Sequence, residues 1–208
     1  KKSKKKVVTS KITTTVQTTT TQQVSIANET AVSTTSSGTS VAQATAAASS
    51  SQNQSKYEAN VASVAGKMDN RVIAAYQQLG FKLVVDPSVN YSGYFDARSR
   101  SITMKQIDDT VYHELGHFLA FIAGNVDKTA SFQSIFAAEK ANVTAFNKAY
   151  VTQNASEYFA ESVKDYILNN ASLKSTRPQT YAAVQNALNQ ITDAQIAKIQ
   201  KIYGAFWN

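Results

Sequence analysis

Residues 111–119 of the sequence are Val111-Tyr112-His113-Glu114-Leu115-Gly116-His117-Phe118-Leu119. His113 and His117 are four positions apart, so on an α-helix both imidazoles lie on one side, about 40° apart in projection. The apolar side chains gather on the opposite side of the same helix: Val111, Leu115, Phe118, Leu119 and Ile122. Gly116 weakens a helix by about 1 kcal/mol relative to alanine, which indicates close approach of another element. The stretch therefore predicts a helix over about residues 108–123, packed on its apolar face.

The only two histidines of the chain are both in this motif. Neutral imidazoles at this spacing are typical zinc ligands, and zinc with one open position activates water for attack on a carbonyl group. Glu114 lies about 100° from His113, where a carboxylate can accept the water proton without joining the ligands. The HExxH spacing predicts one zinc ion held by His113 and His117, with Glu114 as the catalytic base. The alternative is a surface helix with two unrelated histidines.

A zinc site of this kind needs a third protein ligand from elsewhere in the chain. The residues directly after His117 are apolar and include no further histidine, so a carboxylate is required. A helix expected over about residues 155–169 carries Glu157 and Glu161 on one face. One acid would bind zinc, and the other would accept the second N–H of a histidine ligand and orient its ring. Spacing does not decide which acid has which role, and a solvated helix face is the alternative.

From residue 55 onward the sequence has the pattern of a folded α+β domain. Apolar residues from Tyr57 to Tyr76 recur at helical spacing, and Gly80 stands where a helix would end. Short apolar or aromatic runs predict strands at residues 81–85, 91–95 and 101–104. Further helices are expected at about residues 128–139, 155–169, 178–190 and 193–206. These elements predict a mostly helical catalytic domain with a small β-sheet, in which the edge strand Ser101 to Met104 pairs with an extended substrate.

Residues 1–54 differ in composition from the rest of the chain. They are mostly Thr, Ser, Ala, Gln and Val, and the first aromatic residue is Tyr57. Such a segment buries too little apolar surface to offset the entropy lost on folding, which predicts a disordered tail. The tail would be a flexible tether, either a wall-spanning stalk or a spacer without a specific role. The predicted domains are therefore a tether at 1–54 and a metallopeptidase domain at 55–208.

Most of the formal net charge of +7 belongs to the N-terminus. The lysines there are Lys1, Lys2, Lys4, Lys5, Lys6 and Lys11. Without these six, 15 Lys and Arg residues face 14 Asp and Glu residues, so the body of the chain is nearly neutral. No specific nucleic-acid partner is expected. The basic end either touches cell-wall polymers or anionic surfaces, or is a solvated tail.

The sequence contains no cysteine, which excludes disulfides, thiolate zinc sites and a cysteine nucleophile. No run approaches the roughly 18 consecutive apolar residues of a membrane-spanning helix, so no transmembrane segment is expected. The sequence begins with Lys1 rather than methionine, and a cleaved signal peptide is one explanation. We therefore expect a secreted, monomeric protein with a peptide or protein substrate.

From about residue 108 to residue 189 the chain resembles the anthrax lethal factor-like metallopeptidases, and among them the secreted bacterial Pro-Pro endopeptidases. The zinc motif carries the resemblance together with Tyr150, which stands seven residues before Glu157. The remaining matches are the segments Ser131-Phe132-Gln133-Ser134-Ile135-Phe136-Ala137-Ala138-Glu139, Glu157-Tyr158-Phe159-Ala160-Glu161-Ser162 and Arg177-Pro178-Gln179-Thr180-Tyr181. The resemblance covers most of the second half of the chain.

This resemblance implies a zincin-type fold and assigns a role to each site residue. Glu157 matches the third zinc ligand, Glu114 the catalytic base and Glu161 the acid behind a ligand. Tyr150 matches the tyrosine that assists the oxyanion, a role in which a phenol donor near the metal stabilises developing negative charge. Without the resemblance, Tyr150 is interpreted as a core aromatic residue.

The chain also departs from the Pro-Pro endopeptidases. Only residues 89–106 stand where those enzymes carry a longer segment with a tryptophan, and the sole tryptophan here is Trp207. Ser156 precedes Glu157 at a position where a Pro-Pro endopeptidase has a second acid. Four residues of the predicted hairpin either line a substrate pocket that replaces the missing segment or simply pack on the sheet: Tyr91, Tyr94, Phe95 and Arg98. The sequence leaves the preference for Pro-Pro bonds open.

The sequence thus predicts a secreted zinc-dependent endopeptidase that hydrolyses internal peptide bonds, in proline-rich segments of surface proteins. One alternative is a non-catalytic surface-binding or adhesion module on a Ser/Thr-rich stalk. Another is a lethal factor-like effector peptidase that acts inside a target cell. A purely structural zinc site would have no use for Glu114 and would normally fill its fourth position, which favours catalysis over the adhesion module.

Overall fold

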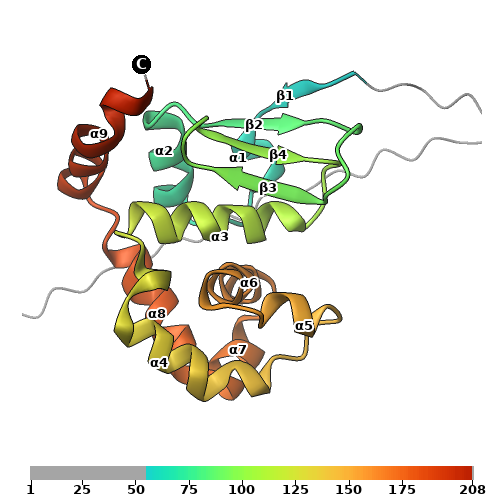
Figure 1. Cartoon of the computed structure of the whole chain (residues 1–208), viewed down its shortest axis with the longest axis vertical. Helices are drawn as coiled ribbons and strands as arrows, with labels where there is room; N and C mark the ends of the chain where they lie inside the picture. The colour runs from blue at the N-terminus through green and yellow to red at the C-terminus, as the bar shows by residue number, and fades with distance from the viewer. Residues whose placement is uncertain (1–54, 208) are drawn as a thin grey trace, which may run out of the picture. The chain divides into compact units, whose positions relative to one another are not determined.

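A computed structural model describes residues 55–207, in which helices predominate and four strands form one small sheet (Figure 1). This arrangement confirms the predicted α+β class. The predicted tether at residues 1–54 lies outside the described residues. Within the part of the chain that the structure describes, no helix is long and apolar enough to cross a bilayer.

The sheet contains β1 (Tyr57–Ala59), β2 (Lys82–Val85), β3 (Gly93–Asp96) and β4 (Ser101–Met104), in the order β1-β2-β4-β3. β2 and β4 run parallel, with Leu83 beside Ile102, while β3 and β4 form an antiparallel hairpin with Phe95 opposite Ile102. β1 pairs antiparallel with β2. Figure 1 shows β3 at the edge that lies alongside the helix α3 (Thr110–Ile122).

The prediction that residues 101–104 form an edge strand is wrong. β4 lies between β2 and β3, so both of its edges are already hydrogen-bonded within the sheet and neither can pair with a substrate. Burial explains the order, because Ile102 and Met104 are fully buried whereas every residue of β3 is at least partly exposed. The more apolar strand takes the inner position, and β3 forms the edge beside α3.

The single helix predicted from Tyr57 toward Gly80 is also wrong. The segment forms β1 and then two helices, α1 (Val61–Val64) and α2 (Asn70–Gln78). The side chains of Asn60 and Asp69 accept backbone hydrogen bonds at the two helix starts, and such caps fix where a helix begins. Gly80, with φ of +73°, follows α2 in a left-handed conformation that suits glycine, so the predicted end of the helix is confirmed.

The other predicted helices are present, with ends shifted by a few residues: α3, α4 (Ala130–Glu139), α6 (Ala155–Leu168), α8 (Pro178–Asn189) and α9 (Asp193–Trp207). Short elements that the sequence did not predict are η1 (Val126–Lys128), η2 (Lys140–Asn142), α5 (Lys148–Val151) and α7 (Asn170–Thr176). Each has at most two turns, which is too short for a recognisable apolar period.

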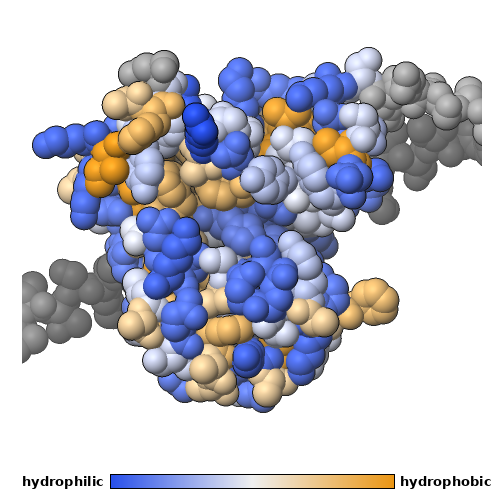
Figure 2. Space-filling view, in the orientation of Figure 1, coloured by the Kyte–Doolittle hydropathy of each residue, from blue (hydrophilic) through white to orange (hydrophobic). Residues whose placement is uncertain are grey.

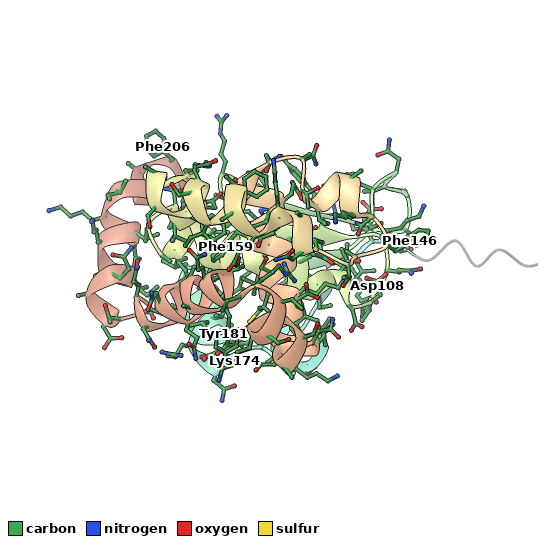
Figure 3. The ribbon with its side chains drawn as sticks, turned by 90° about the horizontal axis from the view of Figure 1, so that it is seen from below. Asp108, Phe146, Phe159, Lys174, Tyr181 and Phe206 are labelled. Carbon is green, nitrogen blue, oxygen red and sulfur yellow. The ribbon has the colours of Figure 1, made fainter. Side chains whose placement is uncertain are left out.

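The helix α3 supplies the centre of the core. Leu115 and Phe118 on its apolar face are fully buried, and the Phe118 ring meets the Tyr76 ring edge-on at 5.0 Å. On the other side of α3 lies α6, whose Phe159 is also fully buried. In Figure 3, Phe159 lies in the interior, whereas Phe206 of α9 projects outward at one end of the molecule.

A glycine allows α3 and α6 to touch. A Cβ added to Gly116 would lie 2.7 Å from both the Cα and the carbonyl oxygen of Ala160, so a side chain there would push the two backbones apart. The close approach predicted at Gly116 is therefore confirmed. It brings the polar face of α3 against the first turns of α6.

A buried polar network fixes α6 to the helices behind it. Arg177, just before α8, pairs with Asp165 of α6 and donates to the Ser162 hydroxyl at 3.0 Å. Glu139 at the end of α4 accepts hydrogen bonds from the N–H and the hydroxyl of Thr180 in α8. Breaking one partner of such a pair leaves a buried charge uncompensated, which is strongly destabilising. The network therefore holds α6 in place relative to α4 and α8.

Replacing Gly116 by alanine is expected to lower the free energy of unfolding by about 1–3 kcal/mol, because the added methyl group would overlap the Ala160 backbone. The matched control is Gly204→Ala in α9, where nothing lies within 4 Å of an added Cβ. There the better helix propensity of alanine should raise stability by up to about 1 kcal/mol. Urea denaturation followed by circular dichroism measures both changes. The same sign for the two variants would contradict the close approach of the helices.

Candidate metal centre

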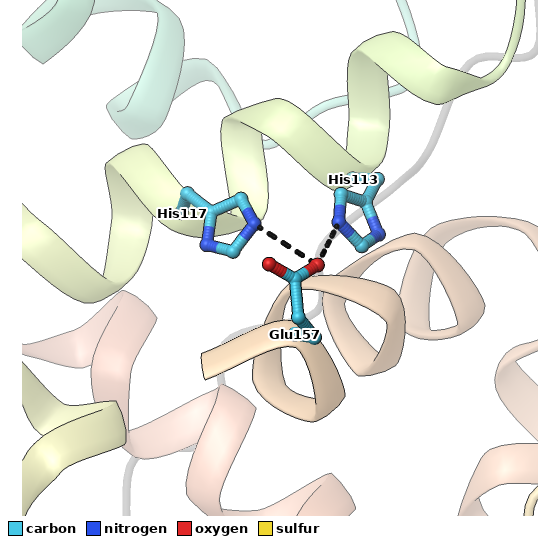
Figure 4. Close-up of side chains that lie close together, drawn as sticks. All are labelled: His113, His117 and Glu157. Atoms are coloured by element: carbon cyan, nitrogen blue, oxygen red, sulfur yellow. Dashed lines mark hydrogen bonds and ion pairs between the residues drawn. The ribbon is translucent and has the colours of Figure 1, made fainter. Parts of the chain in front are cut away.

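Three side chains from two helices converge between α3 and α6 (Figure 4). Nε2 of His113 lies 3.1 Å from Oε2 of Glu157, and Nε2 of His117 lies 3.6 Å from the same oxygen. One ligand atom from each of the three residues lies within 4.8 Å of the others. The structure thus brings both histidines of the motif to Glu157.

Local capping sets the position of Glu157. The Asn154 side chain begins α6 by accepting a hydrogen bond from the backbone N–H of Glu157 at 2.9 Å. Glu157 therefore lies in the first turn, where the positive end of the helix dipole stabilises a carboxylate. Asn154 is not among the residues predicted from the sequence, although an Asn followed three residues later by Glu is a signature of a helix start.

Glu161, one turn further along α6, holds the other ring nitrogen of His113. Its Oε2 lies 2.9 Å from Nδ1, and its Oε1 lies 3.5 Å from the Lys164 ammonium group. Burial alone would lower the pKa of His113, but the hydrogen bonds to Glu157 and Glu161 outweigh burial and raise this pKa to about 9. A carboxylate on Nδ1–H also orients the ring and leaves Nε2 available to a metal.

The donor set fits a zinc ion. Zinc bonds to imidazole nitrogen and carboxylate oxygen are about 2.0–2.2 Å long, so donor atoms of a tetrahedral site lie roughly 3.3 Å apart. The separations of 3.1 Å and 3.6 Å are close to this value. Burial would raise the pKa of Glu157, but hydrogen bonds from His113 and His117 hold it well below the usual range, so Glu157 is ionised and can bind a metal ion. Two imidazoles and one carboxylate leave a fourth position for water.

Glu114 lies buried between α3 and β3. A Cβ added to Gly93 would lie 2.6 Å from Oε1 of Glu114, so only glycine leaves room for this carboxyl group. Burial raises the pKa of Glu114, although the nearby histidines oppose this shift. A carboxyl group with a raised pKa is suited to accept and return a proton near neutral pH. Gly93 was missed in the sequence, where a glycine inside a strand is the signal for close approach of another group.

Tyr150 on α5 lines the same cavity as His113 and Glu114, which has a volume of about 340 Å³. Tyr150 is 53% exposed, so it does not belong to the core. Partial burial and the negative charge of Glu157 raise the pKa of Tyr150, which keeps the phenol protonated and able to donate a hydrogen bond. In Figure 2, a hydrophilic hollow separates the sheet with α3 from the helices below it.

The aromatic residues of the hairpin lie at different parts of the site. Tyr91 lines the cavity that contains Tyr150, and its ring centre lies 5.8 Å from that of the exposed Tyr94. Phe95 lies on the other side of the ligands, where its ring stacks beside His117 with centres 6.5 Å apart. Of these three aromatic residues, Tyr91 lies at the cavity of Tyr150 and Phe95 lies beside His117, so only part of the predicted replacement pocket is at the candidate metal centre.

Arg98 lies away from the three ligand residues. It lines a separate cavity with Trp207, at the end of the hairpin. Trp207 donates its indole N–H to the carbonyl oxygen of Ala97 at 2.8 Å. The tryptophan therefore supports the hairpin turn from α9.

Comparison with known proteins places this site in a family context. A family model described as "Anthrax toxin lethal factor, N- and C-terminal domain" matches residues 97–187. The Pro-Pro endopeptidase of Clostridioides difficile (strain 630) is 41% identical over 78 residues, which are 36% of this chain and 34% of that protein. Over these residues the chain is similar to the lethal factor-like peptidases. The residues matched by the family model include the predicted zinc ligands, Glu114, Tyr150 and Glu161. The alignment with the curated relative spans about a third of that protein's length.

Zinc affinity is expected to rise with pH. Below about pH 9, His113 of the metal-free protein holds a proton that zinc must displace, so affinity should fall about tenfold per unit as the pH drops from 9 to 7. Competition with a chromogenic chelator measures this dependence. In Glu161→Gln, one carboxylate that raises the pKa of His113 is lost. The pKa of His113 should therefore be lower, and zinc affinity should begin to fall at a lower pH than in the wild-type protein. Affinity that is independent of pH in both proteins would show that His113 is not a ligand.

Proposed function

We propose that the protein is a zinc-dependent endopeptidase. The observation that carries the proposal is the buried Glu114 carboxyl group, on the same helix as two histidines whose Nε2 atoms converge with Glu157. A structural zinc site needs no base and normally has four protein ligands. Among residues 55–207, the group that fits a metal has three. The relationship to the lethal factor-like peptidases supports the same activity.

Each side chain of the site has a distinct role in hydrolysis. When bound, zinc supplies a Lewis acid that polarises a carbonyl group and lowers the pKa of water from about 15.7 to about 7. Glu114 accepts the proton of the attacking water and returns it to the leaving amine, and its raised pKa suits both transfers. Glu161 holds the His113 ring through Nδ1. The Tyr150 phenol donates a hydrogen bond to the oxyanion that develops on the scissile carbonyl.

The edge strand β3 takes the substrate-binding role that the sequence assigned to residues 101–104. Within the described sheet, β3 is paired only with β4, and its Gly93 backbone lies directly against Glu114. An extended peptide binds to such an edge through main-chain hydrogen bonds. A substrate on β3 would pass beside the base and the ligands.

The substrate class is proposed by analogy. The curated relative is named a Pro-Pro endopeptidase. By analogy, we propose that this protein cleaves proline-rich segments of surface proteins. Secretion, a monomeric state and contact of the basic N-terminus with the cell wall or an anionic surface stay predictions. The basic N-terminus lies outside the described residues.

The wild-type protein is expected to cleave members of a peptide library with proline-rich and proline-free sequences, and a chelator should abolish cleavage. Glu114→Gln fits the same space against Gly93 but cannot accept the proton, so kcat should fall by about 10²–10⁴ while about one zinc ion stays bound. Glu58→Gln, at an exposed position on β1, removes the same charge and should retain full activity. Undiminished activity of Glu114→Gln would refute the mechanism. Zinc binding without any cleavage would favour the adhesion module.

Replacement of Tyr150 by phenylalanine tests the oxyanion role separately. The variant should lose about 10²-fold in kcat with its zinc content unchanged, because only the phenol hydrogen bond is removed. Tyr57→Phe, the same chemical change at an exposed position on β1, serves as the control and should have no effect. Loss of zinc from Tyr150→Phe would mean that this tyrosine supports the metal and not the oxyanion.

A further inference from the structure

A second cavity flanks the metal ligands on the side away from Tyr150. Its volume is about 190 Å³, and it is lined by His117 and by Ser156, the residue before Glu157. One wall is aromatic, formed by Phe95 and Phe121, while η1 contributes Asp127 and Lys128. The cavity therefore borders one of the three candidate ligands, His117, and is large enough for more than one water molecule, which needs about 30 Å³ in the liquid.

Asp127 is a buried acid with half of its hydrogen-bonding capacity unused. Its side chain is 5% exposed, and Oδ2 accepts a hydrogen bond from the Ser156 hydroxyl. Oδ1 is buried and has no hydrogen-bond partner among residues 55–207. An unpaired buried oxygen of this kind costs about 1–3 kcal/mol, so its presence calls for a partner that residues 55–207 do not supply.

The surroundings of Asp127 determine what that partner would be. No described Lys or Arg side chain forms an ion pair with Asp127, and the neighbouring Lys128 is exposed. The walls formed by Phe95 and Phe121 are apolar, which suits a hydrocarbon stem. The terminal torsion of an aspartate is soft, so its carboxylate can turn to meet a donor in the cavity. A long side chain with a cationic end fits this combination.

We propose that this cavity is a substrate subsite that selects a lysine or arginine side chain next to the scissile bond, with Asp127 as the residue that recognises the charge. The stem of the side chain packs along the aromatic wall of Phe95 and Phe121, whose ring centres lie 6.1 Å apart, and its cationic end pairs with the Asp127 carboxylate. The position follows from the lining, because His117 and Ser156 place the cavity directly beside the ligands. This inference rests on the proposed peptidase activity.

The test uses the best-cleaved peptide of the library, with each residue flanking the scissile bond changed in turn to lysine, arginine, norleucine or glutamate. The wild-type protein should cleave the lysine or arginine form at one flanking position at least about tenfold faster, in kcat/KM, than the norleucine form. In Asp127→Asn this ratio should fall to about one, whereas Asp193→Asn, at an exposed position on α9, should keep it.

A second variant avoids any change to the buried acid. Lys128 lines the same cavity at an exposed position, so Lys128→Ala removes a positive charge that repels a basic substrate side chain and should raise the preference for basic residues by about threefold. A wild-type enzyme without a basic preference, or one whose preference survives in Asp127→Asn, would overturn the subsite and leave the peptidase proposal standing. Failure of the wild-type protein to cleave any peptide in a chelator-sensitive way would overturn both.

Discussion

The backbone contact between Gly116 of α3 and Ala160 of α6 is the constraint on which the candidate site depends. A zinc ion requires donor atoms from the two helices to lie roughly 3.3 Å apart, so the separation of α3 and α6 must be closely fixed. The glycine removes the side chain that would separate the helices. The polar network around Arg177 holds α6 from behind, so the contact is maintained on both sides.

The resulting site concentrates negative charge around two imidazoles. Glu157 and Glu161 each hold one nitrogen of His113, and their hydrogen bonds raise the pKa of this histidine to about 9. In the metal-free protein the extra proton compensates these carboxylates, and a divalent cation would take over that compensation. Burial raises the pKa of Glu114 in the same site, whereas the pKa of Glu157 is lowered, so the two acids suit different roles: a proton acceptor and the proposed metal ligand.

The sequence predicted those parts of the site that depend on local spacing. His113, Glu114 and His117 lie within five residues of one helix, so the period of the helix already sets their arrangement. The roles of Glu157 and Glu161 depend on how α6 packs against α3. The spacing of residues in the sequence does not show this packing, so the family resemblance was needed to predict the two roles. The inner position of β4 and the unpaired oxygen of Asp127 arise from contacts between distant segments, and the local pattern gives no signal for either.

Zinc K-edge X-ray absorption of the protein loaded with one equivalent of zinc tests most directly whether His113, His117 and Glu157 hold the metal. We predict a four-coordinate ion with two imidazole nitrogens and light-atom distances of about 2.0–2.2 Å. The imidazole scattering should disappear when both histidines are replaced by alanine. A six-coordinate, all-oxygen spectrum from the wild-type protein, unchanged in the double variant, would contradict the assignment of the metal centre.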